Sequence, residues 1–358
     1  MLIHLFTGES LYSTRFLDFV NRYFDNQKHY FIFRRPPVSG IHYSPKITRH
    51  ISYVYNWRQI LLLMLPALHR ARRIYIHFLP IGPSLILLAL LPWLWRKCVW
   101  KVWGDDLYWF QRRSDHFVDS LYERCRRLFI RNLSEIIAPM RGDYEVALSN
   151  YHTRARYSYA IYPLPTDNKM LAQARDYRKH PAEPPVVLVG NSGDPLNYHI
   201  EALHTLAFLK NMPVKIICPL NYAGDEDYYR EVMITGTHLL ADRFSALTEI
   251  LPPQHYLRLL ATVDVAIMNH RRQQGLGNIF ALIYLGKKIY LHTTTTPFQY
   301  LTGLGIRVFD TLSLARQDAG SLFSFDETDR ESNYRIIREE LSDAKYLTLW
   351  NAILTSVD

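Results

Sequence analysis

Short apolar segments alternate with helical segments along this sequence, and that alternation is the feature that most restricts its fold. In the first half, apolar runs predict strands, and the stretches between them have the spacing of surface helices. The predicted strands cover 2–6, 29–33, 51–55, 74–79, 98–103 and 135–140, and the predicted helices cover about 11–23, 57–72, 84–95 and 115–132. Strands that alternate with helices pair in parallel through right-handed crossovers. We therefore expect an α/β fold with parallel sheets.

The alternation stops between residues 162 and 185, where prolines and charged residues predominate, as is typical of a linker. It resumes with predicted strands at 185–190, 214–220, 263–269 and 288–292 and predicted helices at 197–210, 226–235, 253–261 and 278–286. The sequence thus predicts two Rossmann-like domains, 1–162 and 163–335, followed by a helical tail at 336–358. Parallel sheets bind ligands at the carboxyl ends of their strands, so we expect the site in a central cleft between the domains.

The two halves of the chain differ in charge. Residues 1–162 carry 23 Lys and Arg against 11 Asp and Glu, whereas residues 163–358 carry 19 against 22. The imbalance indicates either an anionic partner of the first half, which could be a membrane surface or a nucleic acid, or a solvated basic face without a partner. No RRM, KH, zinc-finger or helix-turn-helix pattern is visible, and we therefore expect no nucleic-acid partner.

Residues 91–113 are rich in Trp, Tyr, Lys and Arg, a mixture that suits the headgroup zone of a bilayer. Arg112 and Arg113 end this segment, and Arg124, Arg127 and Arg131 share one face of the next predicted helix. These residues predict contact with an anionic membrane surface. The alternative interpretation is that the tryptophans are buried in the core and the arginines are merely solvated.

The 22 residues between Arg73 and Arg96 have no formal charge and raise the question of a membrane span. Pro80, Gly82 and Pro83 interrupt them, which favours a strand, a turn and a helix over 84–95. Such a helix is about 18 Å long, shorter than a hydrocarbon core of roughly 30 Å. We therefore expect a peripheral membrane protein without a transmembrane helix.

The segment VVLVGNSGD (186–194) predicts a buried strand that ends in a glycine-rich turn. Gly190 and Gly193 would let backbone N–H groups approach an anion, and Asn191 and Ser192 add side-chain donors. The turn lacks both the GxGxxG spacing and the Walker lysine, which excludes an ordinary dinucleotide site or a P-loop ATPase. Taken alone, such a turn is equally consistent with a purely structural role.

The segment HRRQQGLGNIFALIYLGKK (270–288) predicts a second and more informative loop, which follows a strand and opens a helix. Backbone N–H groups at the start of that helix would face a pyrophosphate, and Arg271 or Arg272 would add charge-assisted hydrogen bonds. The candidate ligand-binding residues of this loop are Arg272, Gln273, Gln274, Gly275, Gly277 and Asn278.

The order of loop, helix, Gly286 and strand resembles the nucleotide-sugar site in the C-terminal domain of two-domain GT-B glycosyltransferases. A narrower resemblance rests on short motifs in both predicted domains: LIH (2–4), His77 at the end of IYIH, WGDDLY (103–108), MRGD (140–143), LVGNSGD (188–194), HIEAL (199–203) and RQQGLG (272–277). On these motifs the chain resembles glycosyltransferase family 56. The resemblance implies a GT-B fold and a sugar-transfer reaction.

The resemblance also implies the substrates. The donor would be a dTDP-sugar co-substrate carrying 4-acetamido-4,6-dideoxygalactose, and the acceptor an undecaprenyl-pyrophosphate-linked saccharide of enterobacterial common antigen synthesis. The enzyme would then work at the cytoplasmic face of the bacterial inner membrane, which agrees with the basic charge of the first half. The alternative is a peripheral membrane or nucleic-acid-binding protein without catalysis.

For chemistry, GT-B enzymes generally need no metal, and we expect neither a metal nor a cofactor. Adjacent Asp105 and Asp106 should point apart at a strand end, which does not suit a shared metal ion. Asp105, Asp106 and His77 are nevertheless candidates for the base that takes a proton from the acceptor hydroxyl. The structural alternatives are a turn or cap role for the aspartates and a hydrogen-bonded core position for the histidine.

Overall fold

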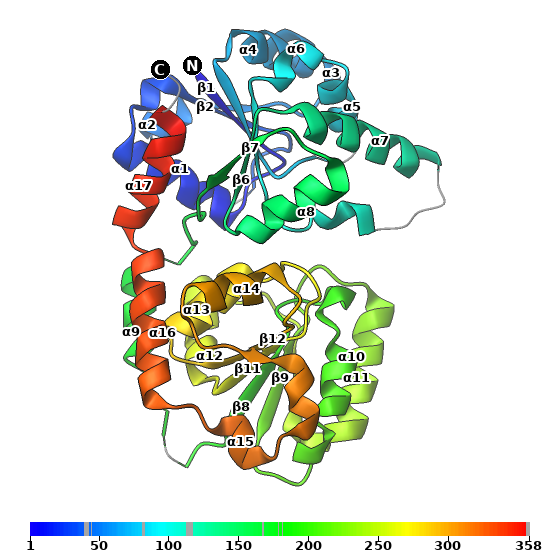
Figure 1. Cartoon of the computed structure of the whole chain (residues 1–358), viewed down its shortest axis with the longest axis vertical. Helices are drawn as coiled ribbons and strands as arrows, with labels where there is room; N and C mark the ends of the chain where they lie inside the picture. The colour runs from blue at the N-terminus through cyan, green and yellow to red at the C-terminus, as the bar shows by residue number, and fades with distance from the viewer. Residues whose placement is uncertain are drawn as a thin grey trace. The chain divides into compact units, whose positions relative to one another are not determined.

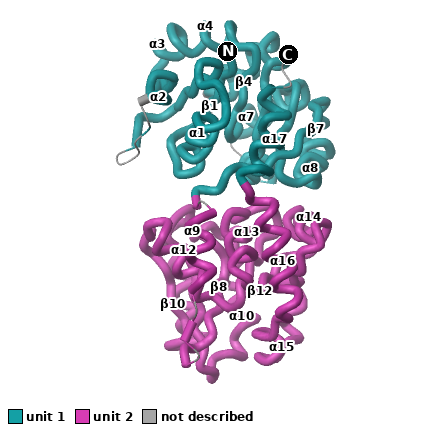
Figure 2. The backbone as a smooth tube through the Cα atoms, turned by 90° about the vertical axis from the view of Figure 1, so that its left-hand side faces the viewer, with its two compact units in different colours: residues 1–165, 343–358 teal, residues 166–342 magenta. Residues whose placement is uncertain are grey.

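The computed structural model describes residues 1–38, 43, 45–80, 83–111, 117–166, 168–177, 179–180 and 182–355. The chain forms two compact units, shown in different colours in Figure 2. Unit 1 comprises Met1–Pro165 with Asp343–Asp358, and unit 2 comprises Thr166–Ser342. In each unit, helices lie on both sides of a parallel sheet (Figure 1), as the alternation of strands and helices predicts.

The sheet of unit 1 has seven strands in the order β3-β2-β1-β4-β5-β6-β7, and all described pairs are parallel. The strands are β1 (Leu2–Phe6), β2 (His29–Phe33), β3 (Ile51–Tyr53), β4 (Arg73–His77), β5 (Cys98–Lys101), β6 (Glu135–Ala138) and β7 (Arg156–Tyr159). Six of them coincide with predicted strands. The seventh, β7, was not predicted, because RYSY is short and carries no run of apolar residues.

The helices of unit 1 are α1 (Leu11–Tyr23), α2 (Pro45–Thr48), α3 (Trp57–Gln59), α4 (Leu65–Arg70), α5 (Pro83–Ala89), α6 (Pro92–Trp95), α7 (Phe117–Asn132) and α8 (Arg141–Tyr151). A π-helical turn, η2 (Ile60–Met64), joins α3 to α4. The single helix predicted over 84–95 is divided into α5 and α6. Pro92 causes this division, because proline has no N–H for the interior of a helix but is well suited to its first turn.

Unit 2 has six parallel strands in the order β10-β9-β8-β11-β12-β13. They are β8 (Val186–Val189), β9 (Lys215–Pro219), β10 (Phe244–Leu247), β11 (Val265–Met268), β12 (Lys288–Leu291) and β13 (Phe309–Asp310). The helices are α9 (Asn168–Arg175), α10 (His199–Thr205), α11 (Glu226–Leu240), α12 (Pro253–Thr262), α13 (Leu276–Tyr284), α14 (Thr296–Gly303), α15 (Ala319–Phe323) and α16 (Glu327–Glu340).

The C-terminal helix α17 (Asp343–Thr355) belongs to unit 1 rather than to a separate tail. The indole of Trp350 donates to the backbone oxygen of Ile161 at 3.0 Å, and the hydroxyl of Tyr75 donates to that of Ile353 at 3.1 Å. Because Trp350 is fully buried, these contacts make α17 part of the core of unit 1. The division of the structure thus differs from the sequence-based one, in which residues 336–358 formed a tail.

Three histidines form a hydrogen-bonded row across the sheet of unit 1. His4 lies on β1, and its two ring nitrogens are 3.0 Å from Nε2 of His77 and 2.9 Å from Nδ1 of His29. All three are buried. Burial lowers the pKa of His29 to about 4 and lowers the pKa values of His4 and His77 well below their ordinary value, so the row is neutral at pH 7.

Acidification should therefore destabilise unit 1. An unfolded histidine has a pKa of about 6.5, so below that pH the unfolded chain binds protons that the folded row does not bind. Above about pH 6.5 these groups should not affect the free energy of unfolding; below it, that free energy should fall by up to ~1.4 kcal/mol per pH unit for each histidine, until its folded pKa is reached. Urea titrations followed by tryptophan fluorescence measure this effect, because all 7 tryptophans lie in unit 1.

The variant His29→Gln serves as the control. It removes one titrating ring and should show a smaller loss of stability between about pH 6.5 and 5 than the unsubstituted protein. Equal slopes for the two proteins would mean that other groups cause the loss.

Candidate functional site

The two glycine-rich loops predicted from the sequence lie at the same edge of the sheet of unit 2. One follows β8 and the other follows β11, and these two strands are neighbours at the centre of the sheet. Along the chain, β8 is followed by β9 and β11 is followed by β12. In the sheet, β9 lies on the side of β8 away from β11, and β12 lies on the side of β11 away from β8. The strand order therefore reverses between β8 and β11, and this switch point is where open parallel sheets bind ligands.

The loop after β8 requires glycine at two positions. Gly190 has a φ of +73°, and a Cβ there would lie 2.4 Å from Nε2 of His199 and 2.7 Å from Oδ1 of Asn197. A Cβ on Gly193 would lie 2.1 Å from the ring of Tyr229. Both glycines thus let the loop pack closely against its own domain, in addition to any contact with a ligand.

Asn197 joins the two loops through its side-chain amide. Its Oδ1 accepts a hydrogen bond from the backbone N–H of Asn191 at 2.8 Å and lies 2.8 Å from Nε2 of His270. Its Nδ2 donates to the backbone oxygen of Asp194 at 2.9 Å, which fixes the orientation of the amide. Burial lowers the pKa of His270 to about 3, so this ring is neutral and its Nε2 carries the proton that Oδ1 accepts.

The loop after β11 contacts the first loop directly. Gly275 has a φ of +64° and precedes α13, and a Cβ there would lie 2.9 Å from Oδ1 of Asn191. Arg272 is almost fully buried, and its guanidinium lies 3.6 Å from the carboxylate of Asp194. The structure thus brings the predicted residues Gly190, Asn191, Ser192 and Gly193 together with Arg272 and Gly275.

The remaining predicted residues lie close by. Gln273 is buried, and Gln274 is half-buried beside it. Gly277 and Asn278 are half-buried in the first turn of α13. All four thus belong to the loop and helix start that follow β11.

Several buried polar atoms at these loops have no hydrogen-bond partner among the described residues. They are Oδ1 of Asn191, Nε2 of His199, Oε1 of Gln273 and Oε1 of Gln274. A buried polar atom without a partner costs about 1–3 kcal/mol, and most such atoms in proteins are satisfied. A polar ligand bound at the switch point would supply the missing partners.

Sequence reasoning did not identify Asn197 or His199 as parts of this site, and it did not single out Asp194 or His270 within the two quoted segments. All four are polar, lie within a few residues of the glycine-rich loops, and are at most partly exposed. The signal was this proximity, but only the structure shows that their side chains are directed at the loops.

In unit 1, Asp106 anchors the turn that follows β5. Its carboxylate accepts hydrogen bonds from the backbone N–H groups of Leu79 and Trp103, each at 2.9 Å, and from the indole of Trp100 at 2.8 Å. The side chain is fully buried, and burial raises its pKa. We therefore assign Asp106 a structural role, the alternative given above, instead of the role of a base.

His77 is likewise enclosed by protein. Besides its contact with His4, its Nδ1 lies 3.3 Å from the hydroxyl of Tyr162, and its ring stacks on Phe6 with 4.3 Å between centroids. The ring is almost fully buried. This is the hydrogen-bonded core histidine of the alternative interpretation, and we assign it a structural role as well.

Two half-buried carboxylates remain near the carboxyl ends of the strands of unit 1. Asp105 lies in the turn after β5. Glu9, which sequence reasoning missed, follows β1 at the switch point between β1 and β4. It accepts hydrogen bonds from the backbone N–H of Val38 at 2.6 Å and from the hydroxyl of Tyr53 at 2.5 Å. The sequence did contain an indication of Glu9. It lies in TGES (7–10), a glycine-containing loop between a predicted strand and a predicted helix, like the two loops of unit 2.

The predicted membrane-binding arginines of α7 are exposed. Arg127 pairs with Glu123 at 2.9 Å, and Arg112 and Arg113 lie outside the described residues. Within the described part of the chain, no helix combines the length and apolar character needed to cross a bilayer. The same residues contain no group of three or more His, Cys, Asp or Glu side chains arranged to hold a metal ion.

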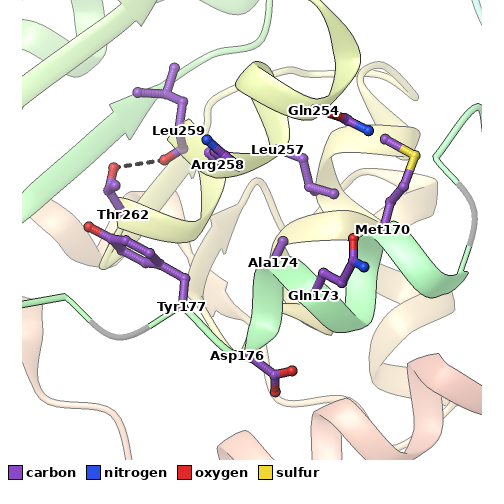
Figure 3. A pocket seen from close by; sticks show the side chains of 10 residues that line it. All are labelled: Met170, Gln173, Ala174, Asp176, Tyr177, Gln254, Leu257, Arg258, Leu259 and Thr262. Carbon is purple, nitrogen blue, oxygen red and sulfur yellow. Dashed lines mark hydrogen bonds between the residues drawn. The ribbon is translucent and has the colours of Figure 1, made fainter.

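A separate cavity of about 840 Å³ lies between α9 and α12 of unit 2 (Figure 3). It is lined by side chains such as Met170, Tyr177, Gln254 and Arg258. None of its lining residues belongs to the two glycine-rich loops, so this cavity is not part of the site at the switch point.

Several solved structures are similar to this chain over almost its whole length. HepE from Anabaena in complex with UDP and glucose is 15% identical, covers 99% of each chain and gives a TM-score of 0.68. A glycosyltransferase from Rickettsia africae ESF-5 is 12% identical, with coverage of 99% and 98% and a TM-score of 0.66. WaaG, a glycosyltransferase involved in lipopolysaccharide biosynthesis, is 12% identical, with coverage of 100% and 99% and a TM-score of 0.61. At these identities the likeness establishes the GT-B fold.

The sequence itself matches a family model. The model describes the 4-alpha-L-fucosyltransferases of glycosyl transferase group 56, and the match covers residues 76–318, more than half of the chain. It includes the turn with Asp105 and both loops of the switch point. The alternative of a protein without catalysis is thereby replaced by an enzyme that transfers a sugar. The chain belongs to glycosyltransferase group 56.

Proposed function

We propose that this glycosyltransferase moves a deoxyamino sugar of the 4-acetamido-4,6-dideoxygalactose type from a dTDP donor to a lipid-pyrophosphate-linked saccharide. The acceptor lipid would be undecaprenyl pyrophosphate, and the reaction would take place at the cytoplasmic face of the inner membrane in the synthesis of enterobacterial common antigen. The proposal of a nucleotide-sugar donor rests on one observation. The two glycine-rich loops lie together at the switch point of unit 2, with unsatisfied polar atoms and a buried arginine.

The diphosphate of the donor is the group that suits Arg272. Its guanidinium is almost fully buried beside the carboxylate of Asp194, and a phosphate oxygen that approached it would accept charge-assisted hydrogen bonds. Gly275 immediately precedes α13, and the positive end of the helix dipole would add to the attraction for a diphosphate.

The sugar of the donor suits the unsatisfied atoms. Three of them are amide oxygens, on Asn191, Gln273 and Gln274, and they accept hydrogen bonds. Sugar hydroxyl groups and the N–H of an acetamido group are donors. A ligand that presents several donors beside a diphosphate therefore matches the chemistry of these loops.

Departure of the nucleoside diphosphate requires stabilisation of negative charge, and we assign it to Arg272 and the start of α13 without a metal ion. The adjacent aspartates of unit 1 do not form a metal-binding pair, because the carboxylate of Asp106 already accepts three hydrogen bonds within its domain. On the acceptor side we propose Asp105 as the base, since it is the only one of the three original candidates that is not enclosed by protein.

Arg272 and its neighbour Arg271 provide a matched test of the donor site. Arg272→Ala should weaken dTDP binding by about 1.5–3 kcal/mol, because it removes a buried charge-assisted contact. Arg271→Ala should change it by about 1 kcal/mol or less, because this side chain is 51% exposed and pairs with Glu201 at 2.6 Å. Isothermal titration calorimetry with dTDP, UDP and GDP measures both effects and the preference for the base. Equal losses in the two variants, or tighter binding of UDP or GDP than of dTDP, would contradict the proposal.

Comparing variants of the two adjacent aspartates distinguishes an effect on catalysis from an effect on stability. Asp105→Asn should retain dTDP affinity while turnover on a lipid-linked acceptor falls about a hundredfold or more, the usual contribution of a general base. Asp106→Asn should instead lower the melting temperature of unit 1, because an amide cannot accept all three hydrogen bonds that the carboxylate accepts. Full turnover by Asp105→Asn would exclude it as the base and make Glu9→Gln the next variant to assay.

A further inference from the structure

Unit 1 contains a long segment without any acidic residue. Residues 26–104 include 12 Lys and Arg and no Asp or Glu. The segment includes β2, β3, β4 and β5 and the helices α3, α4 and α6. Lys101 is buried and Arg73 pairs with Glu135 at 2.8 Å, but the exposed Arg and Lys side chains of the segment favour an anionic partner.

The same segment exposes large apolar side chains at one place. In η2 the consecutive residues Leu61, Leu62 and Leu63 are 58%, 73% and 55% exposed, whereas Ile60 and Met64 on either side are buried. Trp57 at the start of α3 is exposed as well. Three adjacent leucines in water are unfavourable for a monomeric surface and indicate a contact that covers them.

Further exposed apolar side chains lie on the neighbouring helices. Leu90, after α5, and Trp93, on α6, are exposed. The indole of Trp93 donates to Nε2 of His69 on α4 at 2.9 Å, and Nζ of Lys97 donates to the backbone oxygen of His69 at 2.8 Å. These bonds place α6 beside α4, and Figure 1 shows α3, α4 and α6 together at one end of unit 1.

Basic side chains lie close in sequence to this apolar group. Arg58, Arg70, Arg72 and Arg96 are all exposed and lie on or directly after α3, α4 and α6. Exposed apolar and tryptophan side chains on helices that also carry exposed arginines match the two layers of a bilayer surface, in which anionic headgroups overlie acyl chains.

We propose that the face formed by Trp57, Leu61, Leu62, Leu63, Leu90 and Trp93, here called the docking face, inserts into an anionic phospholipid leaflet. The inference deepens the proposed function, on which it rests, by naming the surface that brings the enzyme to its lipid-linked acceptor. Most of these residues and their arginines precede the segment 91–113 that the sequence indicated, and none lies on α7. The arginines favour an anionic partner and the exposed leucines an apolar one, and we assign the face to anionic lipid because a leaflet offers both a charged and an apolar layer.

The test is cosedimentation of the full chain with vesicles of phosphatidylcholine, with and without phosphatidylglycerol. The variant with Leu61→Ser, Leu62→Ser and Leu63→Ser should bind the anionic vesicles about tenfold more weakly or worse, because it removes the apolar part of the face. The matched control carries Ile234→Ser, Ile250→Ser and Leu312→Ser, which remove three equally exposed side chains (63%, 77% and 60%) from unit 2. It should bind as the unsubstituted protein does.

The charge contribution is tested in the same assay. Replacing Arg58, Arg70 and Arg96 with Gln should remove most of the preference for phosphatidylglycerol, whereas replacing the exposed Lys210, Arg316 and Arg335 of unit 2 should not. Anionic vesicles should also shift the tryptophan emission to shorter wavelength, and this shift should be much smaller in the double variant Trp57→Phe, Trp93→Phe.

Undiminished vesicle binding by the leucine variant, with thermal unfolding unchanged, would overturn the proposal. So would a dimer in sedimentation velocity that the leucine variant abolishes, or binding of oligonucleotides that the same substitutions abolish. Calorimetry with dTDP on each variant separates the two hypotheses. If the leucine variant binds both dTDP and vesicles as the unsubstituted protein does, only the docking face is contradicted. If the unsubstituted protein itself does not bind dTDP, the proposed function is contradicted.

Discussion

The hydrogen bonds of Asn197 are the interaction on which the site of unit 2 depends. One amide group holds the backbone of the loop after β8 and the ring of His270 after β11, and so joins the two strands at which the sheet changes direction. Since the amide is buried and both its ends are engaged, its geometry is rigid. The amide thus holds Asn191 beside Gly275, and a ligand bound there would need to order little of the site.

Unit 1 uses buried polar groups for a different purpose. The carboxylate of Asp106 and the row of histidines through His4 are satisfied within the protein, and they connect β1, β2, β4 and β5 at the interior of the sheet. Satisfied polar networks of this kind make a core unique, because any other packing would leave a desolvated group without a partner. Asp105 and Glu9, by contrast, remain partly exposed near the carboxyl ends of the strands.

The pattern of apolar residues was sufficient to predict the class of fold, because strands and helices differ in their local periodicity and their order along the chain can be recognised from it. Strands such as β1, β8 and β11 are buried on both faces and appear as short continuous apolar runs. The strands β7, β10 and β13 lie at or near sheet edges, are short and only partly buried, and so lack that signal. The return of α17 to unit 1 could not be predicted either, because its contacts with Tyr75 and Ile161 join residues far apart in the chain.

The two glycine-rich loops could be predicted at the ends of parallel strands, because the apolar runs and the turn residues that indicate them are local features of the chain. Which of two adjacent residues enters the interior depends instead on contacts that form only in the folded protein. Asp106 is buried and Asp105 is not, because the partners of Asp106 include the backbone of Leu79. Arg272 lies beside Asp194, whereas Arg271 faces water. Leu62 is exposed whereas Met64 is buried, and this difference also depends on the surrounding fold. Neighbours in sequence share composition and periodicity, but burial depends on residues that only folding brings into contact.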